Sequence, residues 1–219
     1  ILYTDYFPRA GKTNGAWCGD FRPQSNMNGN YITPLITNVG NFSKPTSDKP
    51  ALISLDEVRT LFHEFGHALH SLLQNVTYSS AASIPSDFVE LPSQIMENWA
   101  MQPEVLKMYA KHYKTGEIIP QELIDKIDNS RFFNQGFETL EYIAASLLDM
   151  DWHVITDTEE KDVIQFERES ITKMGLIQQI WPRYLTTNFI HIATWGYESG
   201  YYSYLWSAVL DSDAFESFM

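Results

Sequence analysis

The pattern of hydrophobic and polar positions changes near residue 54. Before it, short apolar runs at residues 15–18 and 31–39 lie between Gly, Pro and Asn residues that favour turns. Runs of this length between turn signals predict two or three strands of a small sheet within residues 1–53. After it, apolar residues recur at helical spacing, which predicts that residues 54–219 are mainly helical.

A capping-box pattern marks the start of the first helix, because Ser54 is followed three residues later by Glu57. Asp87 is expected to cap a second helix that runs to about Met101 and has Pro92 in its first turn. Residues 175–199 are mixed and rich in aromatic residues. Further helices are predicted at about 103–115, 120–130, 132–155, 158–174 and 200–218. The predicted class is α+β, predominantly helical, with the small sheet packed on the first helix.

Composition narrows the possible functions. The net charge is −13, with 15 basic and 28 acidic residues, and no Lys/Arg cluster offers a footprint for nucleic acid. No stretch approaches the roughly 20 consecutive apolar residues of a membrane helix. Cys18 stands alone, so no internal disulfide forms. Because the chain begins with Ile1, we expect a piece of a longer protein; a cytoplasmic location is expected, with the periplasm or secretion left open.

The sequence His63-Glu64-Phe65-Gly66-His67 is an HExxH motif inside the first predicted helix. Residues four apart share a helix face, with Cβ atoms about 5–6 Å apart, so both imidazoles can reach one ion. Zinc accepts such nitrogens and leaves one position for water at catalytic sites. Glu64 projects about 100° away from His63 and is therefore expected to act as a base on that water.

A catalytic zinc ion normally has a third protein ligand. His70 lies on nearly the same face as the motif but about a turn too far along the helix. Glu90 is favoured, because the loop before the second helix is long enough for that helix to fold back against the first. Glu97, two turns later, suits a role in orienting a ligand histidine. Asp87 is the remaining candidate.

A second candidate constellation follows His191. Tyr197, Tyr201 and Tyr204 occur at i, i+4 and i+7, which places them on one stripe if the segment is helical. Phenol and imidazole donors would stabilise the negative charge that develops on a carbonyl oxygen during amide hydrolysis. On spacing alone, an aromatic core stripe is the favoured interpretation, and the sequence does not bring these residues next to His63.

Several stretches resemble the thimet-oligopeptidase-like zinc peptidases, specifically their peptidyl-dipeptidase branch, and they follow the family's order along the chain. They are residues 44–51, 60–70, 87–94, 147–150 with Trp152 and His153, and 201–206. The resemblance implies a zincin-like catalytic core covering residues 1–219 and one Zn²⁺ per chain. It also implies short peptide substrates. The roles implied are metal ligands at His63, His67 and Glu90, a base at Glu64, transition-state donors at His191, Tyr197 and Tyr204, and substrate contact at Tyr201.

The chain departs from the family's pattern at two positions. Trp195 stands in a loop that is usually Gly-rich, and Ser86 replaces an Arg that commonly precedes Asp87. The main functional hypothesis is zinc-dependent hydrolysis of short peptides with release of C-terminal dipeptides. Cleavage of internal bonds with the same chemistry is one alternative, and a non-catalytic peptide-binding helical domain is the other.

Overall fold

The computed structural model describes residues 1–177, 179–194 and 196–219, without the side chains of Asn28 and Ser79. The chain forms two compact units. Unit 1 comprises Ile1–Lys126 and Ser207–Met219, and unit 2 comprises Ile127–Trp206. The predicted sheet and the helix that follows it therefore belong to the same unit.

A three-stranded sheet opens unit 1, with β1 (Leu2–Asp5), β2 (Trp17–Arg22) and β3 (Leu35–Val39). The order is β1-β3-β2; β3 runs parallel to β1 and antiparallel to β2. Alternate residues of β3 are buried, including Ile36 and Asn38, as expected for a strand with one face against a helix. The small sheet predicted from the sequence is confirmed.

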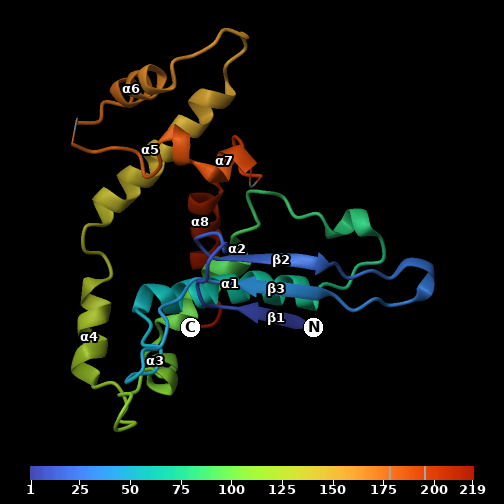
Figure 1. The fold of residues 1–219 in the computed structure, drawn as a ribbon, viewed down its shortest axis with the longest axis vertical. Coiled ribbons are helices and arrows are strands. Elements are labelled where there is room, and N and C mark those ends of the chain that lie inside the picture. The colour runs from blue at the N-terminus through green and yellow to red at the C-terminus, as the bar shows by residue number, and fades with distance from the viewer. Residues whose placement is uncertain (178, 195) are drawn as a thin grey trace. The chain divides into compact units, whose positions relative to one another are not determined.

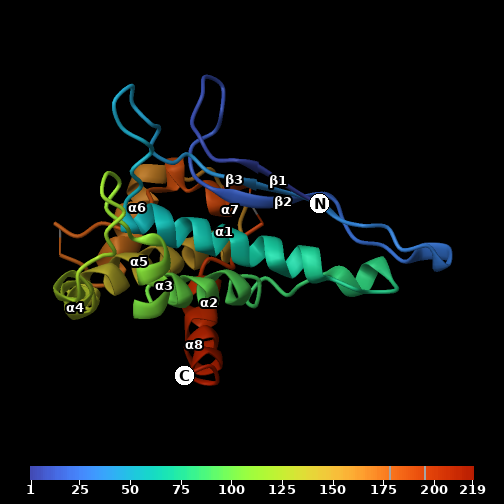
Figure 2. The same cartoon turned by 90° about the horizontal axis from the view of Figure 1, so that it is seen from below.

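Helix α1 (Leu55–Leu73) lies between this sheet and α2 (Leu91–Ala100), as Figures 1 and 2 show. The predicted capping box is present: the Ser54 hydroxyl accepts a hydrogen bond from Glu57 N, and the Glu57 carboxylate accepts one from Ser54 N. The cap fixes the start of α1, and the packed sheet fixes which face of the helix is buried.

Two predicted helix boundaries in unit 1 are wrong. Helix α2 begins at Leu91 rather than just after Asp87, because residues 86–90 form turns and Pro92 occupies the first helical turn. Helix α3 (Pro103–Tyr109) stops before residue 115. A turn containing Gly116 at φ +74° and a β-bridge between Lys111 and Ile118 replace its predicted end.

Unit 2 is built on α5 (Gln135–His153), α6 (Val163–Lys173) and the short α7 (Ile190–Thr194). Ala145, Phe189 and Tyr201 form its buried core. Helices α4 (Gln121–Ser130) and α8 (Ser203–Glu216) each cross a boundary between the units. Three 3-10 helices complete the described chain: η1 (Met27–Gly29), η2 (Ser79–Ala82) and η3 (Thr186–Asn188).

The predicted class, α+β and predominantly helical, is confirmed. Among the described residues, no helix combines the length and apolar character needed to cross a membrane.

Candidate metal centre

Three side chains of unit 1 converge on one point. His63 and His67 project from adjacent turns of α1, and Glu90 reaches them from the N-cap of α2. Glu90 Oε2 lies 3.2 Å from His63 Nε2 and 3.3 Å from His67 Nε2. All three candidate ligand atoms lie within 4.8 Å of one another. This is the group of three that the motif and the third-ligand argument predicted.

These separations fit a tetrahedral ion. Zinc bonds of about 2.0–2.1 Å place any two tetrahedral ligands roughly 3.3 Å apart. The two measured nitrogen–oxygen distances, 3.2 and 3.3 Å, match that spacing. The donor set is two imidazoles and one carboxylate, which is typical of catalytic rather than structural zinc.

Burial of Glu90 favours a positive charge at the centre. Glu90 is 1% exposed, and burying a carboxylate is costly unless it is hydrogen-bonded or paired with a positive charge. Burial acts to raise the pKa of Glu90, but hydrogen bonds from His63 and His67 outweigh it and hold that pKa well below its usual range. Burial disfavours charged His63, yet hydrogen bonds to Glu90 and Glu97 raise its pKa to about 10. A divalent cation bound by these three side chains would supply positive charge beside Glu90.

Two further side chains hold the candidate ligands in place. Glu97 Oε1 lies 2.7 Å from His63 Nδ1, the ring nitrogen that faces away from Glu90. Ser93 is completely buried, and its Oγ lies 2.8 Å from Glu90 Oε2. The contact predicted between Glu97 and a candidate ligand histidine is therefore present.

Glu64 occupies the position next to His63 on α1 and is 6% exposed. Burial raises its pKa, although the charges of His63 and His67 act in the opposite direction. Cys18 of β2 lies close enough to Glu64 for the two groups to interact electrostatically. Burial, and then the negative charge of Glu64, raise the pKa of the Cys18 thiol to about 12. The predicted base thus sits in the interface between the sheet and α1, where a raised pKa favours proton uptake.

The predicted tyrosine constellation forms a cluster within unit 2. Tyr197 and Tyr204 stack with ring centroids 5.4 Å apart, and the His191 ring lies 5.9 Å from the first and 6.2 Å from the second. Tyr201 lies 5.2 Å from His191 and 5.4 Å from Tyr204. The structure therefore brings together the four residues that the sequence grouped.

The helical stripe predicted for these tyrosines is wrong in part. Helix α8 begins only at Ser203, so Tyr197 and Tyr201 belong to the turns that precede it. The turns are stabilised because buried Asp149 of α5 accepts hydrogen bonds from two backbone amides, Ser199 N at 2.9 Å and Tyr201 N at 3.0 Å. Tyr201 is 2% exposed and packs in the core, which supports a packing role more than substrate contact.

Comparison with known proteins decides the family. The sequence profile of Peptidase family M3 matches residues 1–219. The chain belongs to Peptidase family M3. The resemblance inferred from the sequence motifs is confirmed.

The relatives of this M3 chain include a dipeptidyl carboxypeptidase and oligopeptidases. Dipeptidyl carboxypeptidase from Escherichia coli (strain K12) is 44% identical, with 100% of this chain and 32% of the relative aligned. Oligopeptidase A from the same strain is 38% identical, with 99% of this chain and 33% of the relative aligned. Saccharolysin from Saccharomyces cerevisiae (strain ATCC 204508 / S288c) is 33% identical, with 99% and 31% aligned. The chain spans about a third of the length of these relatives.

The sequence alone assigned no role to several residues of this M3 chain that hold the candidate site residues in place. Asp149 lies inside one of the quoted motifs, but its contact with the turns before α8 depends on tertiary structure. Tyr142 donates a hydrogen bond to the carbonyl of Tyr201, again from α5. Arg59 could have been noticed, because it lies four residues before His63 on the same helix face. Trp195, where the chain departs from the family's pattern, lies outside the described residues.

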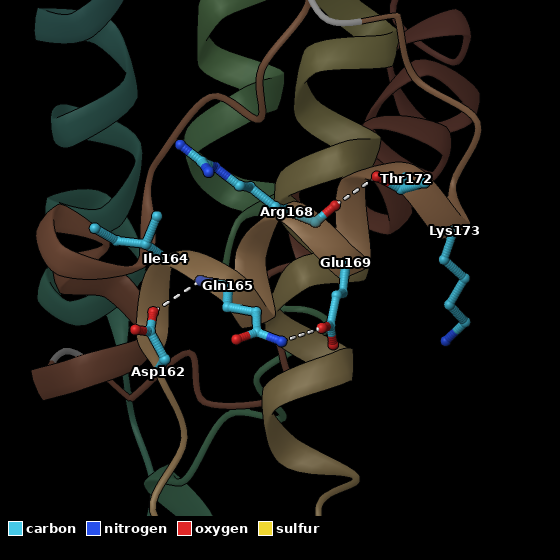
Figure 3. A pocket seen from close by; sticks show the side chains of 7 residues that line it. All are labelled: Asp162, Ile164, Gln165, Arg168, Glu169, Thr172 and Lys173. Carbon is cyan, nitrogen blue, oxygen red and sulfur yellow. Dashed lines mark hydrogen bonds between the residues drawn. The ribbon is translucent and has the colours of Figure 1, made fainter.

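A separate hollow on unit 2 offers a different environment (Figure 3). Two hydrogen bonds lie within its lining: the Gln165 side chain donates to Glu169 Oε1 at 2.7 Å, and the Asp162 carboxylate accepts from the Gln165 backbone amide at 2.9 Å. The residues that line it come from α6 and its N-cap, namely Asp162, Ile164, Gln165, Arg168, Glu169, Thr172 and Lys173. It lacks the histidines that distinguish the centre on α1.

Proposed function

We propose that this chain forms the catalytic centre of a peptidase that hydrolyses short peptides and releases dipeptides from their C-terminus. We also propose that it holds one Zn²⁺ through His63, His67 and Glu90. One observation carries the proposal: two imidazoles from adjacent helical turns meet a buried carboxylate of the next helix at 3.2 and 3.3 Å. The chemistry that zinc supplies at such a centre is Lewis-acid activation of water and of the scissile carbonyl.

In this mechanism Glu64 is the base. It takes the proton of the attacking water and delivers it to the amine that leaves, so that one carboxylate serves both proton transfers. Its buried position and raised pKa support this assignment, because a carboxylate in water would be a weaker proton acceptor.

We propose that His191, Tyr197 and Tyr204 donate hydrogen bonds to the oxyanion of the transition state. Their rings form one cluster in unit 2, which supports a shared role. Preorganised donors of this kind stabilise developing charge without having to reorient during the reaction. Contact between Tyr201 and substrate stays a prediction, against which the burial of its ring counts.

Release of C-terminal dipeptides is favoured over internal cleavage because the dipeptidyl carboxypeptidase is more similar, at 44%, than oligopeptidase A, at 38%. The two specificities differ in whether the substrate's free carboxylate is bound. We expect dipeptides from an unblocked peptide and none from its C-terminally amidated twin, as measured by mass spectrometry. Equal cleavage of both peptides would favour the internal-bond alternative.

Two measurements test the zinc chemistry. Metal analysis of the purified protein should give one zinc per chain. Glu64→Gln should keep that zinc and lower turnover by about 10²- to 10⁴-fold, because it removes the proton acceptor but no ligand. A folded protein that takes up no zinc would support the non-catalytic peptide-binding alternative. Near-normal turnover of the Glu64→Gln variant would exclude Glu64 as the base.

The expected partners are short peptides, whereas nucleic acid and membranes are not expected. The net charge of −13 supports the expectation that the chain does not bind nucleic acid. A cytoplasmic location stays a prediction.

A further inference from the structure

The carboxylate of Glu97 bridges two residues of α1. Its Oε1 lies 2.7 Å from His63 Nδ1, and its Oε2 lies 2.8 Å from an Arg59 guanidinium nitrogen. Arg59 and His63 are four residues apart and therefore share one face of α1, whereas Glu97 belongs to α2. One side chain of α2 is thus held at both oxygens by consecutive turns of α1.

The bridge settles which nitrogen of His63 is available to a metal. A histidine that coordinates through Nε2 carries its proton on Nδ1, and a carboxylate that accepts this proton fixes the tautomer and the ring orientation. Glu97 can accept this proton only if its carboxylate keeps its orientation relative to the imidazole ring. A carboxylate side chain with one engaged oxygen rotates easily about its last bond. The guanidinium of Arg59, which engages the other oxygen, opposes that rotation.

Exposure distinguishes this bridge from an ordinary surface ion pair. The Arg59 side chain is 50% exposed, but that of Glu97 is 22% exposed and that of His63 is 18% exposed. Exposure of Arg59 limits what its pairing adds to folding stability. Its partner, by contrast, lies largely out of water and contacts a candidate metal ligand directly. The effect of Arg59 is therefore expected at the metal centre rather than in the stability of the fold.

We propose that Arg59 is a positioning residue, which acts through Glu97 to hold the His63 ring ready to bind zinc. The inference rests on the proposed function, because it requires His63 to be a ligand. It assigns a role to a side chain whose ion pair is with Glu97 and which would act on His63 through that carboxylate. The two contacts of Glu97 carry it.

Zinc affinity of the whole chain tests the proposal, measured by competition with a chromophoric chelator. Glu97→Gln is expected to weaken zinc binding by about 10- to 100-fold, as other partners of ligand histidines do. Arg59→Met removes the charge but keeps an unbranched apolar stem, and is expected to weaken binding by about two- to fivefold. Arg59→Lys keeps a cation that can reach Glu97 and should recover most of the wild-type affinity.

A double-mutant comparison shows whether Arg59 acts through Glu97. When Glu97 is already Gln, the change Arg59→Met should alter zinc affinity by less than it does in the wild-type chain. Thermal unfolding of the metal-free Arg59→Met protein should match that of the metal-free wild type, which separates positioning from folding. Arg168→Met, on α6 of unit 2, is the matched control for loss of one cation and should leave affinity unchanged.

The outcomes separate this inference from the proposed function. Wild-type affinity in Arg59→Met, or an equal loss in the presence and absence of Glu97, would overturn the role of Arg59 and leave the zinc centre standing. Failure of Arg59→Lys to recover affinity would also count against it. A wild-type chain that binds no zinc would overturn both proposals.

Discussion

A Cβ atom built on Gly66 of α1 would lie 2.2 Å from the carbonyl oxygen of Pro92 in α2. It would also lie 2.6 Å from the Cα atom of Ser93. Real Cβ atoms do not approach backbone atoms so closely, so α1 and α2 can be in contact here only because residue 66 is a glycine. Gly66 is the fourth residue of the HExxH motif, and Pro92 follows the candidate ligand Glu90 by two positions. The absence of a Cβ atom therefore lets the third ligand approach the first two.

We predict that Gly66→Ala disrupts the metal centre. The contacting atoms belong to the backbone of α2, so they cannot swing aside as a side chain would, and the helices must separate. We expect a loss of about 1–3 kcal/mol in the free energy of unfolding, together with weaker zinc binding. Thermal unfolding and chelator competition measure the two effects.

Gly136→Ala is the matched control for Gly66→Ala. Gly136 lies in the exposed first turn of α5, and a Cβ atom built there meets no atom within 4 Å. This change should stabilise the protein by about 0.4–1 kcal/mol, because alanine restricts the unfolded chain more than glycine does. Equal behaviour of the two variants would mean that α1 and α2 do not pack at Gly66 as described.

A second prediction concerns the start of α1. The Glu57 carboxylate accepts hydrogen bonds from Ser54 N at 2.7 Å and from Ser43 N at 2.7 Å. Its pKa is lowered, first by the bond from Ser54 and then, after a smaller opposing effect of burial, by the bonds from Ser43. A lowered folded-state pKa means that this stabilisation is present above the unfolded value of 4.5. It is lost as pH falls through the folded value.

Glu57→Gln should therefore cost about 1 kcal/mol at pH 7, and the difference from wild type should shrink as pH falls below about 4.5. Urea unfolding at several pH values measures it. Glu122→Gln, which alters an exposed pair with Lys126, should change the free energy by less than about 0.5 kcal/mol. A Glu57→Gln effect that stays constant with pH would contradict the assigned hydrogen bonds.

Local signals in the sequence predicted the parts of the centre that depend on one helix. The capping box at Ser54 and the four-residue spacing of His63 and His67 need no tertiary information, and both are as predicted. The start of α2 was predicted too early. Asp87 is a good capping residue and favours an earlier start, whereas Pro92 is tolerated only in the first helical turn and therefore favours a start at Leu91. The two units could not be predicted, because their boundary depends on contacts between residues far apart in the chain.

The tyrosine cluster shows the same limit. Helical periodicity grouped Tyr197, Tyr201 and Tyr204 correctly but gave the wrong reason for their proximity. The turns that bring them together are stabilised by Asp149 and Tyr142 of α5, whose hydrogen-bond partners lie 50 and 59 residues later in the chain. Side-chain acceptors for backbone amides leave no periodic signature in a sequence. Their role follows only from the fold.

A third prediction tests the packing of β2 over Glu64. Cys18 carries the single thiol of the chain, and burial together with the Glu64 charge raises its pKa to about 12. Thiolate is the reactive form, so labelling by an aromatic disulfide at pH 8 should be on the order of 10³-fold slower in the folded than in the unfolded protein. Glu64→Gln should accelerate labelling of the folded protein, because it removes one negative charge. Equal rates in wild type and Glu64→Gln would place Cys18 away from the base.

The last prediction concerns Asp149, which is completely buried and accepts one backbone amide proton at each oxygen, from Ser199 and from Tyr201. Asp149→Asn replaces one acceptor with an NH₂ group, so two donors face each other out of water. We expect a loss of about 1–3 kcal/mol in the free energy of unfolding. A change in the near-ultraviolet circular dichroism of the tyrosine cluster should accompany it.

Asp151→Asn is the matched control on the same helix. Asp151 accepts hydrogen bonds from the Ser170 hydroxyl at 2.7 Å and from Lys173 Nζ at 3.0 Å, both of which rotate freely enough to meet an amide oxygen. Its variant should therefore keep the tyrosine signal. If His191, Tyr197 and Tyr204 donate to the transition state, Asp149→Asn should lower kcat more than it raises KM, because the displaced groups act after substrate has bound. An Asp149→Asn protein with a wild-type tyrosine spectrum and wild-type kcat would show that the turns before α8 do not need this carboxylate.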